Sequence, residues 1–313
     1  MWRKWLVPTE PPDTSTETML RPGSRRLAHS RHMRSTNRVR AALRAGQGAL
    51  HRAVFSTSRI QDTLVAHRDL VDRYRSAGIE APDLTAYEFR VFSQNGEDGV
   101  IAELVRRCGV GGEFFVEFGV GNGSECNTAF LAHTMGWSGV YFEPDSQSYQ
   151  MLEFRYRNHP MVVALPDAIT AENVEEKLAA AGVPAEPDIL SIDIDGNDYW
   201  VWKAIEGYRP RIVIIEYNSA LDTAVSRVQP YADSQGWDHS SGYSASLAAL
   251  ERLAESKGYQ LVHTESTGAN AFFVREDLAD RFPGRVPRRS ANFAFTGAGW
   301  HPAPRRPPDW LAP

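Results

Sequence analysis

Cysteine is scarce in this chain, with only Cys108 and Cys126 among 313 residues. Two cysteines cannot form the disulfide framework of a small secreted protein, and their separation does not match the ligand spacing of a zinc site. We therefore expect both to be reduced, partly buried apolar side chains without chemistry of their own.

Long apolar runs are absent as well. No segment approaches the roughly 20 apolar residues that a membrane-spanning helix needs. Near the N-terminus, Pro8, Pro11 and Pro12 follow only a short apolar stretch, which is not the hydrophobic core of a signal peptide. These absences predict a cytoplasmic protein without a membrane span. The 42% hydrophobic content still suffices for one full-sized core.

Acidic residues are few at the N-terminal end. Residues 1–60 hold twelve of the 34 basic residues but only three of the 39 acidic ones, which leaves 22 basic and 36 acidic residues in the remainder. Residues 1–60 thus form a basic arm. A basic arm can bind nucleic acid, but it is more often solvated or docked on the acidic remainder of its own chain, and we expect one of the latter two arrangements. Residues 1–36 lack periodicity, which predicts disorder, whereas residues 37–85 predict a helical extension.

The most informative stretch is EFFVEFGVGNGSE, from Glu113 to Glu125. Its apolar run predicts a buried strand that contains an acid, Glu117, and breaks into a loop with three alternating glycines. Glycine lets a ligand approach the backbone closely, and the following helix presents unpaired N–H groups. The spacing is G-x-G-x-G rather than the G-x-G-x-x-G of dinucleotide sites. A tight turn without a ligand is the simpler alternative.

Strands and helices alternate through the rest of the chain. Strand segments lie within residues 137–144, 161–165, 188–199 and 211–218, and helices are expected from the SQNGED segment to residue 109 and over residues 127–136, 170–181 and 243–257. Residues 259–264 and 270–275 are separated by a turn too short for a crossover helix, so they must pair antiparallel. The pattern predicts an α/β fold with a mostly parallel seven-stranded sheet and a terminal antiparallel hairpin.

Six motifs, in combination and order, resemble the FkbM-like branch of S-adenosylmethionine-dependent methyltransferases over about residues 90–276. They are SQNGED, VEFGVGNGSECNT, YFEPD, DILSIDIDGNDYW, IVIIEYN and the late GYSASLAALERLAESKGYQLV with NAFFVR. The resemblance implies a Rossmann-like class I methyltransferase domain over residues 86–282. The Pro/Arg-rich tail at residues 283–313 lies outside the resemblance. The resemblance also implies S-adenosylmethionine as cofactor and O-methylation of a small hydroxylated acceptor, such as a sugar or secondary metabolite.

Candidate cofactor residues gather where the strands end, because ligands of such sheets bind beyond the carboxyl ends of the strands. Glu143 lies 24 residues after Gly119, where Rossmann-like sites bind a ribose hydroxyl pair. The residues expected to hold the cofactor are Glu117, Gly119, Gly121, Asn122, Gly123, Glu143, Asp167, Ala168 and Asp193.

Four oxygen-bearing side chains, Asp193, Asp195, Glu216 and Asn218, follow neighbouring strands. Oxygen-only ligands suit Mg²⁺ or Mn²⁺, and such an ion would acidify an acceptor hydroxyl. The segment around Asp193 departs from the Asp-Val-Glu-Gly of many family members and also resembles that of metal-using sugar O-methyltransferases. Alternatively, Asp195 or Asn197 caps a helix and Asn218 makes a turn. Asp195 and His239 are the candidate general bases, although a lone loop histidine is more often simply solvated.

A second function remains open on the sequence alone. The chain is alternatively a catalytically silent nucleoside-binding or scaffold domain whose basic arm recruits a partner. A nicotinamide oxidoreductase is disfavoured by the loop spacing and the terminal hairpin. The sequence does not identify the acceptor or the oligomeric state.

Overall fold

The computed structural model describes residues 69, 72–73, 76–78, 83–232, 240–284, 286–290 and 309–313. The chain divides into two units, Met1–Gln47 and Gly48–Pro313, and every described residue belongs to the second. The predicted basic arm, most of the predicted helical extension and the candidate base His239 lie outside the described residues. Within the described ranges, no helix combines the length and apolarity that crossing a membrane requires.

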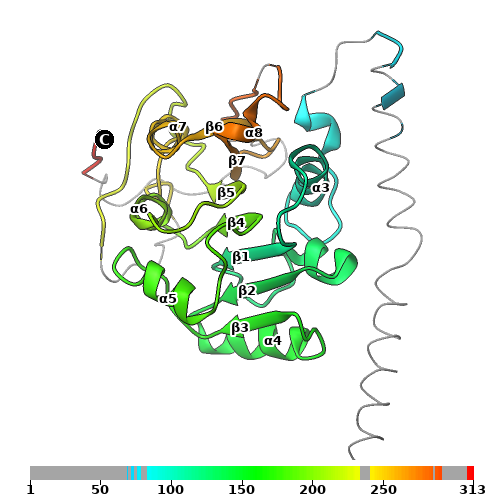
Figure 1. Ribbon diagram of the computed structural model, residues 1–313. Helices are drawn as coiled ribbons and strands as arrows, with labels where there is room; N and C mark the ends of the chain where they lie inside the picture. Colours follow the sequence, from blue (N-terminus) through cyan, green and yellow to red (C-terminus); the bar gives the residue numbers. More distant parts are fainter. Residues whose placement is uncertain are drawn as a thin grey trace, which may run out of the picture. The chain divides into compact units, whose positions relative to one another are not determined.

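A seven-stranded sheet forms the centre of this unit, in the order β3-β2-β1-β4-β5-β7-β6 (Figure 1). Neighbouring strands among β1 to β5 pair in parallel, whereas β7 pairs antiparallel with both β5 and β6. The strands are β1 (Phe114–Phe118), β2 (Ser138–Phe142), β3 (Val162–Leu165), β4 (Ile189–Ile192), β5 (Ile212–Glu216), β6 (Tyr259–Thr264) and β7 (Asn270–Arg275). The order and the terminal hairpin are those of the Rossmann-like class I methyltransferase fold, as predicted.

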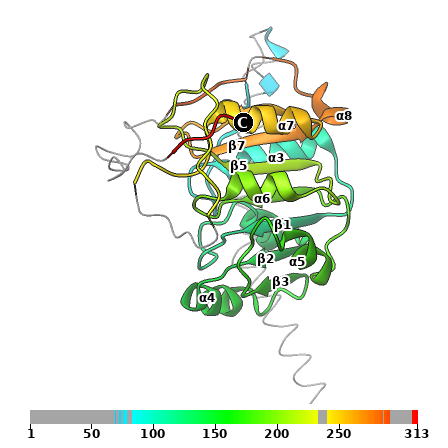
Figure 2. The same ribbon diagram turned by 90° about the vertical axis from the view of Figure 1, so that its left-hand side faces the viewer.

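Helices cover both faces of the sheet. They are α3 (Glu97–Cys108), α4 (Ser146–Tyr156), α5 (Val174–Ala180), α6 (Asp198–Ala204), α7 (Leu247–Ser256) and α8 (Glu276–Ala279), with a 3₁₀ turn η1 (Leu84–Tyr87) and a π-helical turn η2 (Leu131–Met135). Helices α5, α6 and α7 lie on one face, and α3 lies on the other (Figures 1 and 2). Because strand side chains alternate between faces, Phe115 packs in the α3 layer and Val116 in the opposite layer.

Helix boundaries differ from the predicted ones where side-chain oxygens accept hydrogen bonds from backbone N–H groups. The helix predicted from Asn127 begins two residues later, because Asn127 and Thr128 give their N–H groups to Glu117. Helix α7 begins at Leu247 rather than Tyr243, because the Ser246 hydroxyl accepts the N–H of Ala249 and so caps the helix.

Helix α4 was not predicted. Its hydrophobic residues are not confined to one side, since Met151 and Phe154 are exposed while Leu152 and Tyr156 are buried. The amphipathic spacing by which a helix is recognised is therefore weak here. The Asp145 carboxylate accepts the N–H of Ser148 at 2.8 Å, and this N-cap starts the helix.

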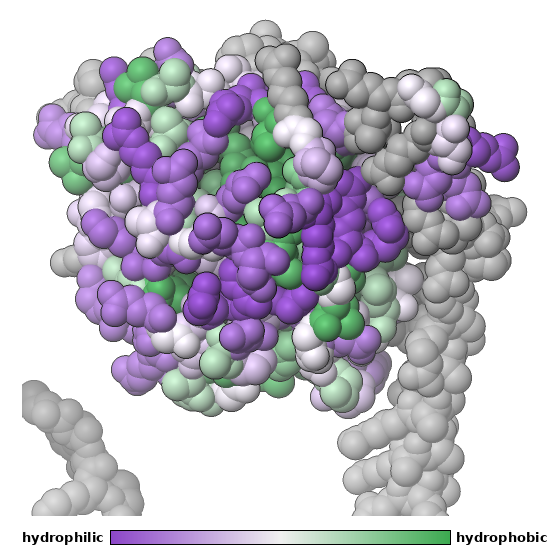
Figure 3. All heavy atoms as spheres, turned by 45° about the horizontal axis from the view of Figure 1, so that its top comes forward, coloured by the Kyte–Doolittle hydropathy of each residue, from purple (hydrophilic) through white to green (hydrophobic). Residues whose placement is uncertain are grey.

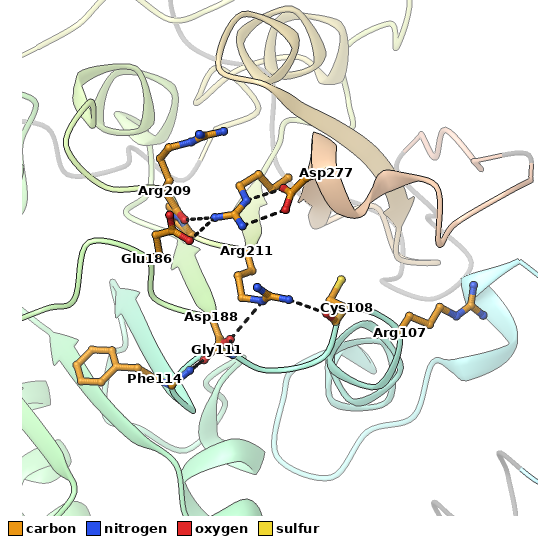
Figure 4. A network of polar contacts seen from close by, with 12 residues as sticks. Arg107, Cys108, Gly111, Phe114, Glu186, Asp188, Arg209, Arg211 and Asp277 are labelled. Atoms are coloured by element: carbon orange, nitrogen blue, oxygen red, sulfur yellow. Dashed lines mark hydrogen bonds and ion pairs between the residues drawn. The ribbon is translucent and has the colours of Figure 1, made fainter.

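Ion pairs and hydrogen bonds tie together the amino ends of the parallel strands (Figure 4). Asp188, which precedes β4 and is 1% exposed, accepts the N–H groups of Gly111, Gly112 and Phe114 at 2.5, 2.9 and 3.2 Å. The Arg211 guanidinium lies 3.5 Å from the same carboxylate and donates to the carbonyl of Cys108. One carboxylate therefore connects the α3–β1 turn to the starts of β1, β4 and β5.

Candidate functional site

The glycine loop leaves β1 at the carboxyl end of the sheet. Gly119, Gly121 and Gly123 all take positive φ, at 72°, 58° and 74°. A Cβ on Gly119 would lie 1.6 Å from the carbonyl oxygen of Asp193, and one on Gly123 would lie 2.7 Å from Leu152 in α4. A Cβ on Gly121 would meet nothing within 4 Å. Packing thus requires the outer two glycines, whereas the middle one faces open space that a ligand can occupy.

The carboxylate of Glu117 binds the segment that follows the glycine loop. Its Oε1 accepts the N–H of Asn127 at 2.8 Å, and its Oε2 accepts the N–H and the hydroxyl of Thr128 at 3.0 and 2.6 Å. The residue is 4% exposed, and burial raises the pKa of its carboxyl to about 7. Glu117 therefore shapes the segment that follows the glycines.

Glu143, at the end of β2, binds the middle of the glycine loop. Its Oε2 accepts the N–H of Gly121 at 2.6 Å and its Oε1 accepts the N–H of Asp145 at 2.8 Å. A carboxylate has about four acceptor positions, so each oxygen can still accept a ligand hydroxyl. The structure thus brings Glu143 directly against the middle glycine.

Three further predicted cofactor residues also lie at the carboxyl ends of strands. The Asn122 side chain accepts the N–H of Ser124 at 2.9 Å within the loop. After β3, Asp167 pairs with Lys177 at 2.5 Å, and the neighbouring Ala168 is exposed. All three border the edge of the sheet that carries the loop, but their side chains are engaged locally or point to solvent.

Asp193, Asp195 and Glu216 form a group of carboxylates beside the loop. Each offers one oxygen, and the three oxygens lie within 4.8 Å of one another. Burial and the neighbouring acids raise the pKa of both Asp193 and Glu216 well above the usual range. The Oε2 atom of Glu216 is buried without a hydrogen-bond partner among the described residues. Asp195 has a φ of 57°, which is uncommon for a residue other than glycine.

Asp198 shapes this group, although it was not among the predicted site residues. It is fully buried at the start of α6, and its carboxylate accepts the N–H groups of Ile194 and Gly196 at 2.8 and 3.0 Å. The carboxyl is buried, which raises its pKa to about 6. The sequence signal was present, because an acid in the first turn of a helix commonly takes preceding N–H groups.

Asn218 makes the turn that the sequence left as an alternative to metal binding. Its side-chain amide donates to the carbonyls of Ser241 and Tyr243, both at 2.9 Å, and its Oδ1 accepts the N–H of Ala220 at 3.1 Å. The residue is 1% exposed. Its amide therefore fastens the end of β5 to the segment before α7.

The SQNGED segment also reaches this end of the sheet. One oxygen of Asp98 accepts the N–H groups of residues 91–93 at 2.7 to 2.8 Å, and the Ser93 hydroxyl accepts the N–H of Asp98 at 3.1 Å. The Ser93 hydroxyl thus accepts an N–H group from the first turn of α3, whose N-cap residue is Gly96. Glu97, the first residue of α3, is fully buried and accepts a hydrogen bond from Asn270 in β7.

A cavity of about 760 Å³ lies elsewhere, between α7, β6 and α8. Figure 3 turns this end of the molecule forward and shows mostly hydrophilic side chains with smaller hydrophobic areas between them. The cavity is lined by several charged residues, among them Glu251, Glu255, Glu276 and Arg288, and Arg288 pairs with Glu251 at 2.6 Å. None of the predicted site residues lines it.

The chain matches no protein-family model and no curated protein. Among solved structures it is similar to an S-adenosylmethionine-dependent methyltransferase from Clostridium acetobutylicum, at 10% identity and a TM-score of 0.35 over 56% of this chain and 89% of that one. It is also similar to the N-terminal domain of EvdMO1 with SAH bound, at 17% identity and a TM-score of 0.38 over 58% of this chain and 80% of that one. A third similar structure is an O-methyltransferase family protein from Burkholderia thailandensis, at 12% identity and a TM-score of 0.37 over 73% of this chain and 72% of that one. A fold hosts many functions, so activity must be argued from the site.

Proposed function

We propose that this chain is an S-adenosylmethionine-dependent methyltransferase of the FkbM-like kind that methylates a hydroxyl of a small acceptor, such as a sugar or a secondary metabolite. The observation that carries the proposal is the open space at Gly121, bounded by Glu143, in a loop whose first glycine, Gly119, packs on the backbone of Asp193. A rigid, polar cradle of this kind suits a cofactor that already carries the reactive group, because the protein then mainly positions it.

The chain's own residues divide the binding task. The backbone at Gly121 and Asn122 would lie against the cofactor, and Glu143 would accept its ribose hydroxyls with the acceptor positions that the loop leaves open. Asp167 and Ala168 would border the adenine. Glu117 acts by holding the loop, since its two oxygens accept hydrogen bonds from Asn127 and Thr128.

A divalent cation, Mg²⁺ or Mn²⁺, fits the group of Asp193, Asp195 and Glu216. Three carboxylates that approach within 4.8 Å repel one another unless a cation or protons intervene, and Glu216 has a buried oxygen with no hydrogen-bond partner in the part of the chain that the structure describes. When bound, the cation would lower the pKa of an acceptor hydroxyl. Asp193 and Glu216 would hold it from the strand ends, and Asp195 from the exposed side. Without a cation, Asp195 or His239 would have to take the proton instead.

Titration calorimetry with S-adenosylmethionine and S-adenosylhomocysteine tests the cofactor site. Gly121→Val should abolish binding, because its side chain would fill the open space. Gly136→Val is the matched control: Gly136 also has a positive φ, 73°, and a Cβ there meets nothing within 4 Å, but it lies before β2, away from the loop. Glu143→Ala should weaken binding by about 1.5–3 kcal/mol through lost charge-assisted hydrogen bonds. Folded Gly121→Val that binds like wild type would refute the site.

Chelation tests the cation. A metabolite extract incubated with labelled cofactor should first yield the methylated acceptor. Turnover should then disappear after EDTA treatment and return with Mg²⁺ or Mn²⁺, while cofactor affinity stays constant. Full turnover in EDTA would overturn the metal assignment. Cofactor binding without turnover on any acceptor would favour the silent nucleoside-binding domain instead.

A further inference from the structure

A row of polar side chains crosses three neighbouring strands at the carboxyl end of the sheet. The β4–β5 register pairs Ile192 with Ile215, so the next residues, Asp193 and Glu216, are level with each other. The β5–β7 register pairs Glu216 directly with Asn270. Directly opposed residues of an antiparallel pair have Cβ atoms about 4.5–5.5 Å apart, so the Asn270 side chain starts next to that of Glu216.

Glu216 and Asn270 also share a face of the sheet. Ile214 and Phe272, two residues away along their strands, both belong to the apolar layer under α3, and side chains two apart on a strand point to the same face. The first residue of α3, Glu97, meets the row there. Its Oε1 accepts a hydrogen bond from the Asn270 side-chain nitrogen at 2.9 Å.

This hydrogen bond fixes the orientation of the Asn270 amide. Because the nitrogen is directed at Glu97, Oδ1 occupies the other branch of the amide. That oxygen is buried, in a residue that is 4% exposed, and has no hydrogen-bond partner among the described residues. The Oε2 atom of Glu216 is likewise buried and has no hydrogen-bond partner among these residues. Two acceptors on directly opposed residues thus lack a donor, and a cation bound between them would satisfy both.

We infer that Asn270 Oδ1 is a fourth protein ligand of the cation held by Asp193, Asp195 and Glu216, and that Glu97 positions the Asn270 amide for this role. The inference rests on the cation of the proposed function. Side-chain amide oxygens are ordinary ligands of hard divalent ions. Asn218, by contrast, already directs both branches of its amide to backbone groups.

Binding of Mn²⁺, followed by the electron paramagnetic resonance of the unbound ion, tests the assignment without any acceptor. Asn270→Ala should weaken binding at least tenfold. Asn127→Ala is the matched control, because Asn127 is also a buried asparagine (6% exposed) that donates its amide to a strand side chain, Ser191, but lies outside the row. Its Mn²⁺ affinity should stay within twofold of wild type.

The number of bound waters separates a ligand from a merely structural residue. With Tb³⁺ in place of Mn²⁺, luminescence lifetimes in H₂O and D₂O should report one more bound water in Asn270→Ala than in wild type. Asn270→Ser, which is too short to reach the ion, should show the same gain if the alanine variant does not fold. Glu97→Gln should reduce affinity without adding a water.

The outcomes distinguish the inference from the proposed function. Unchanged affinity and water number in Asn270→Ala would overturn the inference and leave the three-carboxylate site intact. Wild-type protein that binds S-adenosylmethionine but no Mn²⁺ would overturn the cation together with the inference, and the cofactor site would stand. Loss of cofactor binding as well would overturn the proposed function.

Discussion

The two ends of the central sheet carry acidic side chains in opposite settings. At the amino end, Asp188 accepts three backbone N–H groups and lies beside Arg211 (Figure 4). At the same end, Arg275 pairs with Glu186 and Asp277 at 2.8 and 2.6 Å. At the carboxyl end, no described lysine or arginine forms an ion pair with Asp193 or Glu216. The same sheet therefore pairs acids at its amino end with arginine, whereas Asp193 and Glu216 at its carboxyl end have no lysine or arginine partner among the described residues.

This difference separates structural acids from functional ones. Compensated acids join elements and cost little to keep charged, since each carboxylate has donors that replace water. Burial and the neighbouring acids raise the pKa of the uncompensated acids Asp193 and Glu216, and acids with such raised pKa values gather at functional sites. The comparison predicts that equivalent substitutions at the two ends have unequal or opposite effects.

The largest expected effect comes from the glycines that flank β1. Gly119→Ala at the carboxyl end should destabilise the fold by about 4 kcal/mol or more, because left-handed strain adds to a clash with backbone. Its Cβ would lie 1.6 Å from the Asp193 carbonyl oxygen. Gly111→Ala at the amino end should cost under about 1 kcal/mol, because Gly111 is not among the glycines with positive φ and its Cβ would meet a side-chain oxygen of Asp188 at 3.3 Å rather than a backbone atom. Urea unfolding measures both, and equal losses would contradict the prediction.

Asp188→Asn should destabilise the protein by about 3 kcal/mol, because it breaks a buried, fully paired network. An amide keeps the shape but can turn only one oxygen toward the three N–H groups, and its own nitrogen would face a donor. Chemical denaturation with circular dichroism gives the change, and Glu186→Gln, on an exposed side chain, is the control expected to be near neutral. An Asp188→Asn protein as stable as wild type would show that the network is not structural.

Glu216→Gln should do the reverse at the carboxyl end and stabilise the metal-free protein by about 1–2 kcal/mol. Removing an uncompensated buried charge relieves its repulsion with Asp193 and Asp195. Thermal unfolding in EDTA should therefore give a higher midpoint than wild type. The same variant should lose the stabilisation that wild type gains from Mn²⁺. A lower midpoint in EDTA would mean that Glu216 is compensated after all.

Local sequence patterns predicted the strands, the glycine loop and the acids at the strand ends, because each of these depends on neighbouring residues. They did not predict Asn270 as a site residue, because its position depends on the register between β5 and β7, which are more than 50 residues apart in the chain. For Asn218, the residue type and its place after a strand could be read from the sequence, but not the partners that its amide finds in the segment before α7.

The two ends should also titrate in opposite directions, which is the smallest expected effect. Arg275 lowers the pKa of Glu186 and Asp277, so these acids favour the folded state above their unfolded pKa and lose that contribution as the pH falls through their folded pKa. Burial raises the pKa of Glu117 to about 7, so between about pH 4.5 and 7 the folded state binds more protons there than the unfolded state does. That contribution therefore falls as the pH rises.

Unfolding free energies at pH 5.5 and 6.5 in EDTA, for wild type and Glu117→Gln, isolate the Glu117 contribution. The stability of wild type should fall more over this interval, by about 1 kcal/mol or less, since one extra bound proton changes the free energy by at most about 1.4 kcal/mol per pH unit. Subtracting the variant removes the other titrating groups, including Asp198, whose pKa is about 6. Glu186→Gln should keep the wild-type difference across the same interval, because its carboxyl titrates at lower pH. A Glu117→Gln slope equal to that of wild type would show that Glu117 is ionised throughout and that its hydrogen bonds to Asn127 and Thr128 outweigh its burial.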